Sequence, residues 1–282
     1  MKTSNKLLIA LAVLLIIIPI IVVAINVKIN YQDQNSSQKD YTENYERFDK
    51  KSPEAKSLET GPFSAINIPN ANDAYLNIKI IRDEKTGVKI PTDIADFFSF
   101  AVDNNGILQI TMKNGNQKLP YSPTIFIYGN NISKISIAKA AALYVDINAD
   151  SLILEAKDMD HLSFESTARL KVLTINADHV HDIIPGSNSI NKIESNINES
   201  EFRTGEVNYN WLAINAKGES KIEITGDGRS PGKYGIDNLK INTSDHTALS
   251  IENVRINNIS GNLSDETKVQ MPVKYLKQML KD

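Results

Sequence analysis

The sequence predicts an all-β protein: a parallel β-helix or solenoid-like domain of short strands, preceded by one N-terminal transmembrane helix. Three observations predict this fold class. The chain begins with a long apolar run, and short phrases of alternating apolar and polar residues then recur along most of its length. Helical periodicity is scarce in the middle of the chain. Alternation with a period of two is typical of strands, and strands recurring this closely suit stacked coils.

The apolar run extends from Leu7 to Ile25, with Val27 one residue further on. About 21 helical residues span about 30 Å, the thickness of the hydrocarbon core of a bilayer. We therefore expect a membrane anchor at residues 7–27. Lys2 and Lys6 precede the run, so residues 1–6 should be cytoplasmic and the main domain periplasmic or extracellular. The alternative is a signal peptide cleaved after Val22-Val23-Ala24, which also exports the domain.

Composition excludes several classes of function. The formal net charge is -3, with no excess of positive charge to neutralise phosphates, so we expect no nucleic-acid partner. The absence of cysteine excludes disulfides, thiolate metal sites, a cysteine nucleophile and a lipidated cysteine. Residues 28–60 are polar and charged, which predicts a stalk, with a first element of the domain as the alternative.

The β domain is expected over residues 61–265. Its first strands start at Phe63, at Tyr75 and at Phe98. The runs from Phe98 and from Ile107 flank Asp103-Asn-Asn-Gly, which predicts a hairpin. Another strand should cover residues 123–128.

Beyond Gly129, short apolar phrases recur about every 9–11 residues. We expect the leucines of three of these phrases, Leu152, Leu173 and Leu212, to be buried in successive coils. Asparagine often follows a phrase, where it could adopt the left-handed conformation at corners or stack its amide on the next coil. Such asparagines are Asn148, Asn176, Asn215, Asn242 and Asn258. AT-rich codon usage is a simpler source of frequent asparagine.

The C-terminal tail, residues 266–282, regains helical periodicity. A proline stands at the start of a segment in which Val273, Leu276, Met279 and Leu280 would share one face. We expect a short helix that caps the end of the stack, with a free tail as the alternative.

The phrases at Phe63-Ser-Ala-Ile-Asn-Ile, Leu76-Asn-Ile-Lys-Ile and Asn104-Asn-Gly-Ile-Leu-Gln-Ile resemble the GIN-domain family of bacterial envelope proteins. That family is described as autotransporter-adhesin head domains, and the resemblance covers residues 62–225. It implies a β-helix of short rungs outside the cytoplasm. The family's rungs are rich in Gly-Ser-Gly turns, whereas this chain has only 13 glycines and places Asn and Asp there.

Three sets of residues are candidates for chemistry. His179 and His181 would point to one side of a strand and form a weak candidate metal site, with Asp182 assisting. If Leu212 and Ile214 point inward, Tyr209 and Trp211 form an exposed aromatic pair for a sugar or a protein. The alternative is that the alternation shifts at Asn210 and Trp211 packs in the core. The third set is an acidic stretch with two basic residues nearby: Asp146, Asp150, Asp158, Asp160, Arg169 and Lys171.

We therefore expect a non-catalytic binding, adhesion or scaffold module of the cell envelope. Its partners would be the membrane, through residues 7–27, and an envelope protein or glycan. No cofactor is expected. The alternative is a carbohydrate-active enzyme on the same scaffold, such as a polysaccharide lyase that uses the acidic stretch.

Overall fold

The computed structural model describes residues 15, 17–20, 23, 45–113, 115, 118–187 and 189–281. The chain divides into two units, Met1–Asn44 and Tyr45–Asp282. Most of the expected anchor and the expected stalk up to residue 44 lie outside the described residues. Within the described part, no helix has the length and apolar character needed to cross a membrane.

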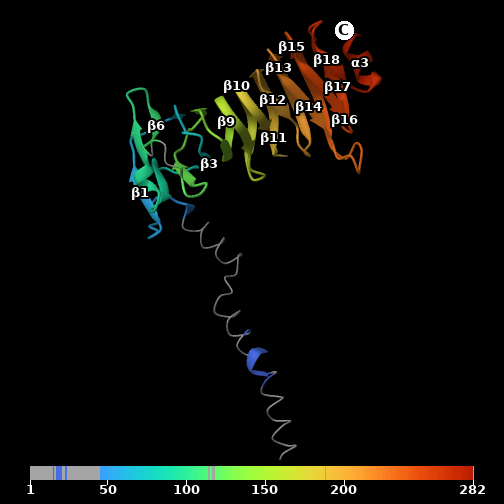
Figure 1. The fold of residues 1–282 in the computed structure, drawn as a ribbon. Coiled ribbons are helices and arrows are strands. Elements are labelled where there is room, and N and C mark those ends of the chain that lie inside the picture. The colour runs from blue at the N-terminus through green and yellow to red at the C-terminus, as the bar shows by residue number, and fades with distance from the viewer. Residues whose placement is uncertain are drawn as a thin grey trace, which may run out of the picture. The chain divides into compact units, whose positions relative to one another are not determined.

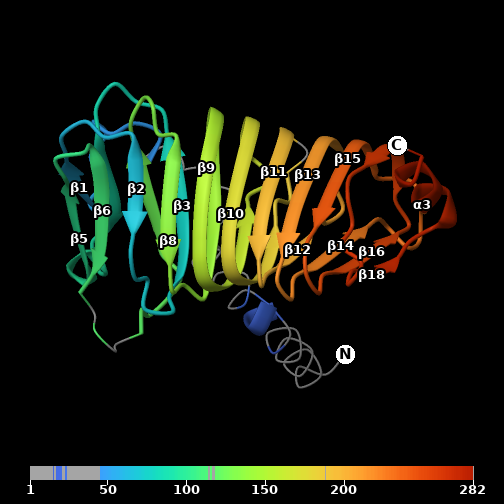
Figure 2. The ribbon, with the colours of Figure 1, turned by 90° about the horizontal axis from the view of Figure 1, so that it is seen from above.

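The second unit is mostly β, as predicted, and its described strands form one 18-stranded sheet (Figures 1 and 2). A short 3-10 helix, Ala95–Phe97, and one α-helix, α3 (Val273–Met279), accompany the strands. The strands are β1 (Ala55–Glu59), β2 (Ala65–Ile68), β3 (Tyr75–Ile81), β4 (Gly87–Pro91), β5 (Phe98–Val102), β6 (Ile107–Met112), β7 (Thr124–Tyr128), β8 (Lys134–Ala138), β9 (Ala142–Phe164), β10 (Arg169–Ile184), β11 (Ile190–Asn198), β12 (Glu201–Arg203), β13 (Tyr209–Lys217), β14 (Lys221–Thr225), β15 (Gly235–Thr243), β16 (Ala248–Glu252), β17 (Arg255–Ser260) and β18 (Lys268–Gln270).

Two parallel ladders run through the unit. Ladder A consists of β2, β8, residues 151–157 of β9, residues 172–178 of β10, then β11, β13, β15 and β17. Ladder B contains β3, residues 142–147 and 159–164 of β9, residues 180–184 of β10, then β12, β14, β16 and β18. The chain alternates between the ladders, so each coil adds one rung to both.

Leucine and isoleucine side chains stack through the interior of ladder A. Leu152, Leu173, Ile193, Leu212 and Leu239 are register partners in successive coils. The three leucines predicted to be buried are 1%, 0% and 0% exposed, so that prediction is confirmed. These five partners are separated by 21, 20, 19 and 27 residues. Loop 226–234 lengthens the last interval without shifting the register of β15 on β13.

Left-handed residues turn the chain from ladder A to ladder B. Six successive corners each have one residue with φ between 46° and 65°: Lys139, Asp158, His179, Glu199, Gly218 and Asp245. The corner between β2 and β3 has two such residues, Asn72 and Asp73. The five asparagines expected at such corners do not have positive φ, so their predicted conformation is wrong. Most lie within rungs, where extended backbone is required for pairing.

The N-terminal end of the unit begins before Gly61. Strand β1 pairs antiparallel with β4, and the rings of Tyr45 and Phe48 are buried against Phe126 and Tyr128. The buried Lys89 donates hydrogen bonds of 2.6 Å to the carbonyl oxygens of Arg47 and Lys50. The assignment of residues 45–59 to a stalk is therefore wrong, because a few large aromatic side chains bury enough surface to hold this segment on the sheet.

The predicted hairpin and the strand at residues 123–128 are confirmed. Strands β5 and β6 pair antiparallel around Asp103-Asn-Asn-Gly, and Gly106 has a φ of +69°. Strand β7 pairs with both β3 and β4.

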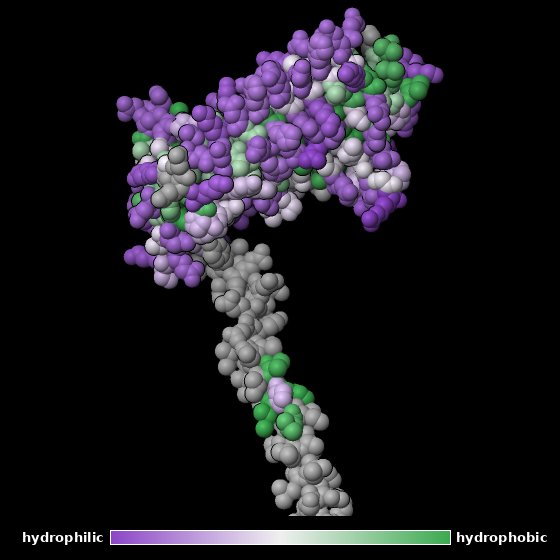
Figure 3. All heavy atoms as spheres, viewed as in Figure 1, coloured by the Kyte–Doolittle hydropathy of each residue, from purple (hydrophilic) through white to green (hydrophobic). Residues whose placement is uncertain are grey.

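The C-terminal helix α3 packs against β17 with a different face from the predicted one. Tyr275 and Met279 are buried, whereas Val273 and Leu280 are 64% and 77% exposed. The Tyr275 hydroxyl accepts a hydrogen bond from the backbone N–H of Ile256 in β17, at 3.0 Å. Hydrophobic residues consequently gather on the surface near the C-terminus (Figure 3).

Candidate functional site

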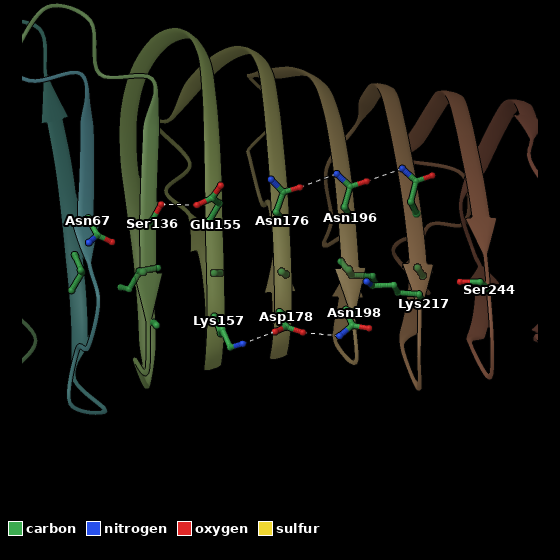
Figure 4. A pocket seen from close by; sticks show the side chains of 18 of the residues that line it. Asn67, Ser136, Glu155, Lys157, Asn176, Asp178, Asn196, Asn198, Lys217 and Ser244 are labelled. Atoms are coloured by element: carbon green, nitrogen blue, oxygen red, sulfur yellow. Dashed lines mark hydrogen bonds and ion pairs between the residues drawn. The ribbon is translucent and has the colours of Figure 1, made fainter. Parts of the chain in front are cut away.

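An open groove of about 850 Å³ follows the outward side of ladder A (Figure 4). Three consecutive residues of each coil line it. The two outer residues of most of these segments point outward, and they form columns because the rungs are in register. The lining segments are residues 67–69, 136–138, 155–157, 176–178, 196–198, 215–217 and 242–244.

Four asparagines form a continuous column of side-chain hydrogen bonds in the groove, here called the amide ladder. The Nδ2 atom of Asn196 donates to Oδ1 of Asn176, at 2.9 Å. Asn215 donates to Asn196, and Asn242 donates to Asn215, both at 2.8 Å. The predicted stacking of asparagine amides between coils is thus confirmed for Asn176, Asn215 and Asn242. It is also confirmed outside the groove for Asn258, whose Nδ2 atom donates to Oδ1 of Asn238, at 3.2 Å. The column exists because strands paired in parallel place equivalent side chains above one another.

Ion pairs flank the amide ladder. Asp178 accepts hydrogen bonds from Asn198, at 2.6 Å, and from Lys157, at 3.0 Å. The hydrogen bond from Asn198, followed by that from Lys157, lowers the pKa of Asp178 to about 2. Glu155 contacts Lys134 at 2.7 Å and Ser136 at 2.8 Å, and these hydrogen bonds, Lys134 first, hold its pKa below the ordinary value. Both carboxylates therefore stay ionised and engaged with neighbours.

The predicted aromatic pair does not form. Tyr209 is 2% exposed and its hydroxyl donates to the carbonyl oxygen of Thr204, whereas Trp211 is 39% exposed. Strand β13 bends here, and two successive residues, Asn210 and Trp211, face outward. The same bend recurs at residues 191–192 and 237–238 of neighbouring coils. Strict alternation therefore fails at this corner.

Trp211 lies in a shallow depression of about 370 Å³ formed with polar neighbours. The other lining residues are Asn191, Lys192, Asn210 and Asn238. The Lys192 ammonium lies 5.8 Å from the centroid of the indole ring. An exposed indole face beside amides suits a sugar or a protein partner, so a binding role for Trp211 alone stays a prediction.

The two candidate histidines have other partners. His179 is a left-handed corner residue, so it lacks the extended backbone that the prediction assumed. Its ring nitrogens contact Asp178, at 3.1 Å, and Glu199, at 2.9 Å. His181 is exposed, and Asp182 binds His161 and Arg203 instead. Across the described residues, no three His, Cys, Asp or Glu side chains are grouped so as to hold a metal ion.

The acidic stretch is divided between two corners of the coil. Asp146 and Asp150 line a depression of about 740 Å³ together with Arg169 and Lys171. Each carboxylate is paired with a lysine: Asp146 with Lys79 at 3.1 Å, and Asp150 with Lys171 at 2.6 Å. Asp158 lies at the left-handed corner after the ladder A rung of the same strand, with Asp160 two residues beyond it. The four carboxylates therefore do not converge on one point.

Comparisons with known proteins give structural likeness only. No family model and no curated protein matches the chain. Among solved structures, the fold is similar to a candidate lipid-binding protein from Parabacteroides distasonis, with 11% identity, coverage of 77% of this chain and 93% of that chain, and a TM-score of 0.45. It is also similar to candidate adhesins from Bacteroides fragilis (14% identity, coverage of 76% and 96%, TM-score 0.42) and from Parabacteroides merdae (14% identity, coverage of 77% and 92%, TM-score 0.44).

Proposed function

We propose that this protein is a membrane-tethered β-solenoid outside the cytoplasm that acts as a non-catalytic binding, adhesion or scaffold module of the cell envelope. Its N-terminal residues 7–27 would anchor it, and the β domain would present its long side to other molecules. The three sequence phrases at residues 63, 76 and 104 support placing it with the GIN-domain family.

The amide ladder is the observation that carries this proposal. Catalytic groups in enzymes need pKa values matched to proton transfer, usually near the working pH. The groups in the groove do not have such pKa values. They are neutral amides in a regular column, flanked by two carboxylates whose pKa values are lowered. Such groups give directional hydrogen bonds to a partner along the coil axis, and a stack of rigid rungs holds them in place.

One experiment can measure both the binding of envelope molecules to the protein and their chemical conversion by it. The full-length chain, in lipid nanodiscs, would be incubated with purified envelope polysaccharides and envelope proteins, and bound material and reaction products would be quantified together. We expect retention without new reducing ends or unsaturated sugars. Product formation that disappears in an Asp146→Asn, Asp150→Asn variant would overturn the proposal in favour of a carbohydrate-active enzyme acting at the depression beside Arg169.

A further inference from the structure

We propose that the groove of ladder A binds a neutral, unbranched glycan that lies along the coil axis, with about one sugar per coil against the amide ladder. This inference rests on the proposed binding function and names the class of partner. Four observations carry it: the spare hydrogen-bonding capacity of the amides, the balance of charge, the spacing of the rungs and the absence of a free backbone edge along the groove.

Each inner amide of the ladder keeps half of its hydrogen-bonding capacity for a partner. An asparagine amide has two N–H donors and two acceptor lone pairs. Asn196 uses one donor on Asn176 and one lone pair for Asn215, and Asn215 uses its groups in the same way. One donor and one acceptor remain on each of these two asparagines, which matches sugar hydroxyls because a hydroxyl both donates and accepts.

The groove carries no excess charge. Its charged lining residues are two acids, Glu155 and Asp178, and two lysines, Lys157 and Lys217, so their formal charges cancel. The carboxylate of Asp178 is already held by Lys157 and Asn198. An anionic polymer would therefore find no net positive field, whereas a neutral polymer does not have to displace these contacts.

The rungs repeat at a distance that suits a sugar chain. Neighbouring strands lie about 4.8 Å apart in the hydrogen-bonding direction. The sugars of an extended, unbranched glycan advance by a similar length, so its hydroxyls can meet successive asparagines without loss of register. With four asparagines in the ladder, the strongest binding requires a chain of about four sugars.

An extended peptide fits this groove less well. Peptides that bind to sheets usually add a strand to a free edge, where backbone N–H and C=O groups lack partners. Here β11 pairs with β10 on one side and β13 on the other, and β13 also pairs with β15. The floor of the groove therefore offers side chains only. A peptide strand rises about 3.3 Å per residue, so its backbone groups would not stay in register with amides that lie about 4.8 Å apart.

Neutral oligosaccharides of increasing length test the inference. The full-length chain in nanodiscs would be titrated by calorimetry with cello-, laminari- and malto-oligosaccharides from dimers to hexamers. Oligogalacturonates of the same lengths are the charged comparison. At least one neutral series should bind with affinity that rises to about the tetramer and then levels, and the charged series should bind more weakly.

Two variants and a control locate the site. The double variant Asn196→Ala, Asn215→Ala should bind the preferred oligosaccharide at least about tenfold more weakly, because it removes the central donors and acceptors. Asn215→Asp keeps the shape of the side chain but loses its donor and adds charge, and should also weaken binding. Asn257→Ala is the matched control, since Asn257 makes an equivalent hydrogen bond to Asp237, at 2.8 Å, outside the groove.

The outcomes separate this inference from the proposed function. Oligosaccharide binding that both groove variants leave unchanged would overturn the amide ladder as the site, while the chain would remain a binding module. If none of the three neutral series binds but an envelope protein is retained, the inference that the groove binds a glycan is overturned. The proposed function as a binding module would then still hold. If the chain retains no envelope polysaccharide and no envelope protein, both the glycan inference and the proposed binding function are overturned.

Discussion

The hydroxyl of Tyr275 in α3 donates a hydrogen bond to the carbonyl oxygen of Val254, just before β17, at 2.9 Å. The hydroxyl oxygen of Tyr275 in turn accepts a hydrogen bond from the backbone N–H of Ile256, at 3.0 Å. Tyr275→Phe should lower the free energy of unfolding by about 1–3 kcal/mol, because it leaves a buried backbone donor unsatisfied. Urea denaturation would measure the change. Lys277→Ala, on the exposed side of the helix, should leave stability unchanged.

Removing residues 268–282 should lower the melting temperature and cause concentration-dependent association. The deletion takes away β18 and α3, so strand edges and apolar residues at this end of the stack become exposed. Calorimetry and analytical ultracentrifugation would follow the two effects. A truncated chain that stays monomeric and melts at the original temperature would show that α3 is not a cap.

Leu173→Ala should destabilise the protein by about 2–5 kcal/mol, because the leucine is fully buried between two coils and its removal leaves a cavity. The matched control is Thr174→Ala in the same rung, which faces outward and should change stability by no more than about 0.5 kcal/mol. Similar losses in the two variants would mean that the alternation in β10 has been assigned to the wrong side.

Tyr209 and Trp211 should behave oppositely when each is replaced by alanine. Tyr209→Ala should cost about 3–5 kcal/mol, as expected for truncating a buried aromatic side chain. Trp211→Ala should have little effect on stability but weaken any partner that uses the depression beside Asn210. Equilibrium unfolding and binding assays on both variants would decide this, and a large stability loss for Trp211→Ala would contradict it.

Acid should weaken the contacts of Asp178 between about pH 4 and pH 2. Its pKa in the folded protein is about 2, below the ordinary 3.8, so its contribution to stability is present above pH 3.8 and is lost as the pH falls toward 2. Asp178→Asn should flatten this part of the dependence of melting temperature on pH. The effect should be small, because the side chain is 36% exposed. An unchanged profile would show that the contacts with Lys157 and Asn198 add nothing to stability.

The anchor prediction is testable by fractionation. The full-length chain should sediment with membranes and resist carbonate extraction. Replacing Leu14 and Ile17 with lysine should abolish integration, since each charge near the centre of a transmembrane helix costs roughly 3 kcal/mol. A soluble species that begins at Ile25 would show that a signal peptide is cleaved.

The alternation of apolar and polar residues predicted much of the β domain from its sequence. The burial of Leu152, Leu173 and Leu212 follows from a period of two within each phrase, and the β5–β6 hairpin follows from Asp103-Asn-Asn-Gly. Both signals are local. They depend on side-chain direction and turn chemistry over a few residues, which a single sequence displays directly.

The conformation of the corners and the residues of the groove could not be predicted from local sequence patterns, because they depend on how the coils pair with one another. Tyr209 is buried because β13 bends and places two outward residues in succession, a break that no pattern in the phrase reveals. The amide ladder depends on register between coils. Asn215 and Asn242 are partners only because loop 226–234 projects without disturbing the rungs, and the irregular spacing of the phrases hides this match.

Loop 226–234 also shows that one coil can be longer than its neighbours while its strands stay paired with theirs. Gly228, Arg229, Ser230 and Pro231 are exposed, while Gly226 and Gly232 hold the ends of the loop through hydrogen bonds to the backbone of residues 252 and 253. Foreign sequence can therefore enter the chain here at little cost. An epitope tag between Arg229 and Ser230 would report whether the intact protein is displayed on living cells, while both ladders keep their pairing.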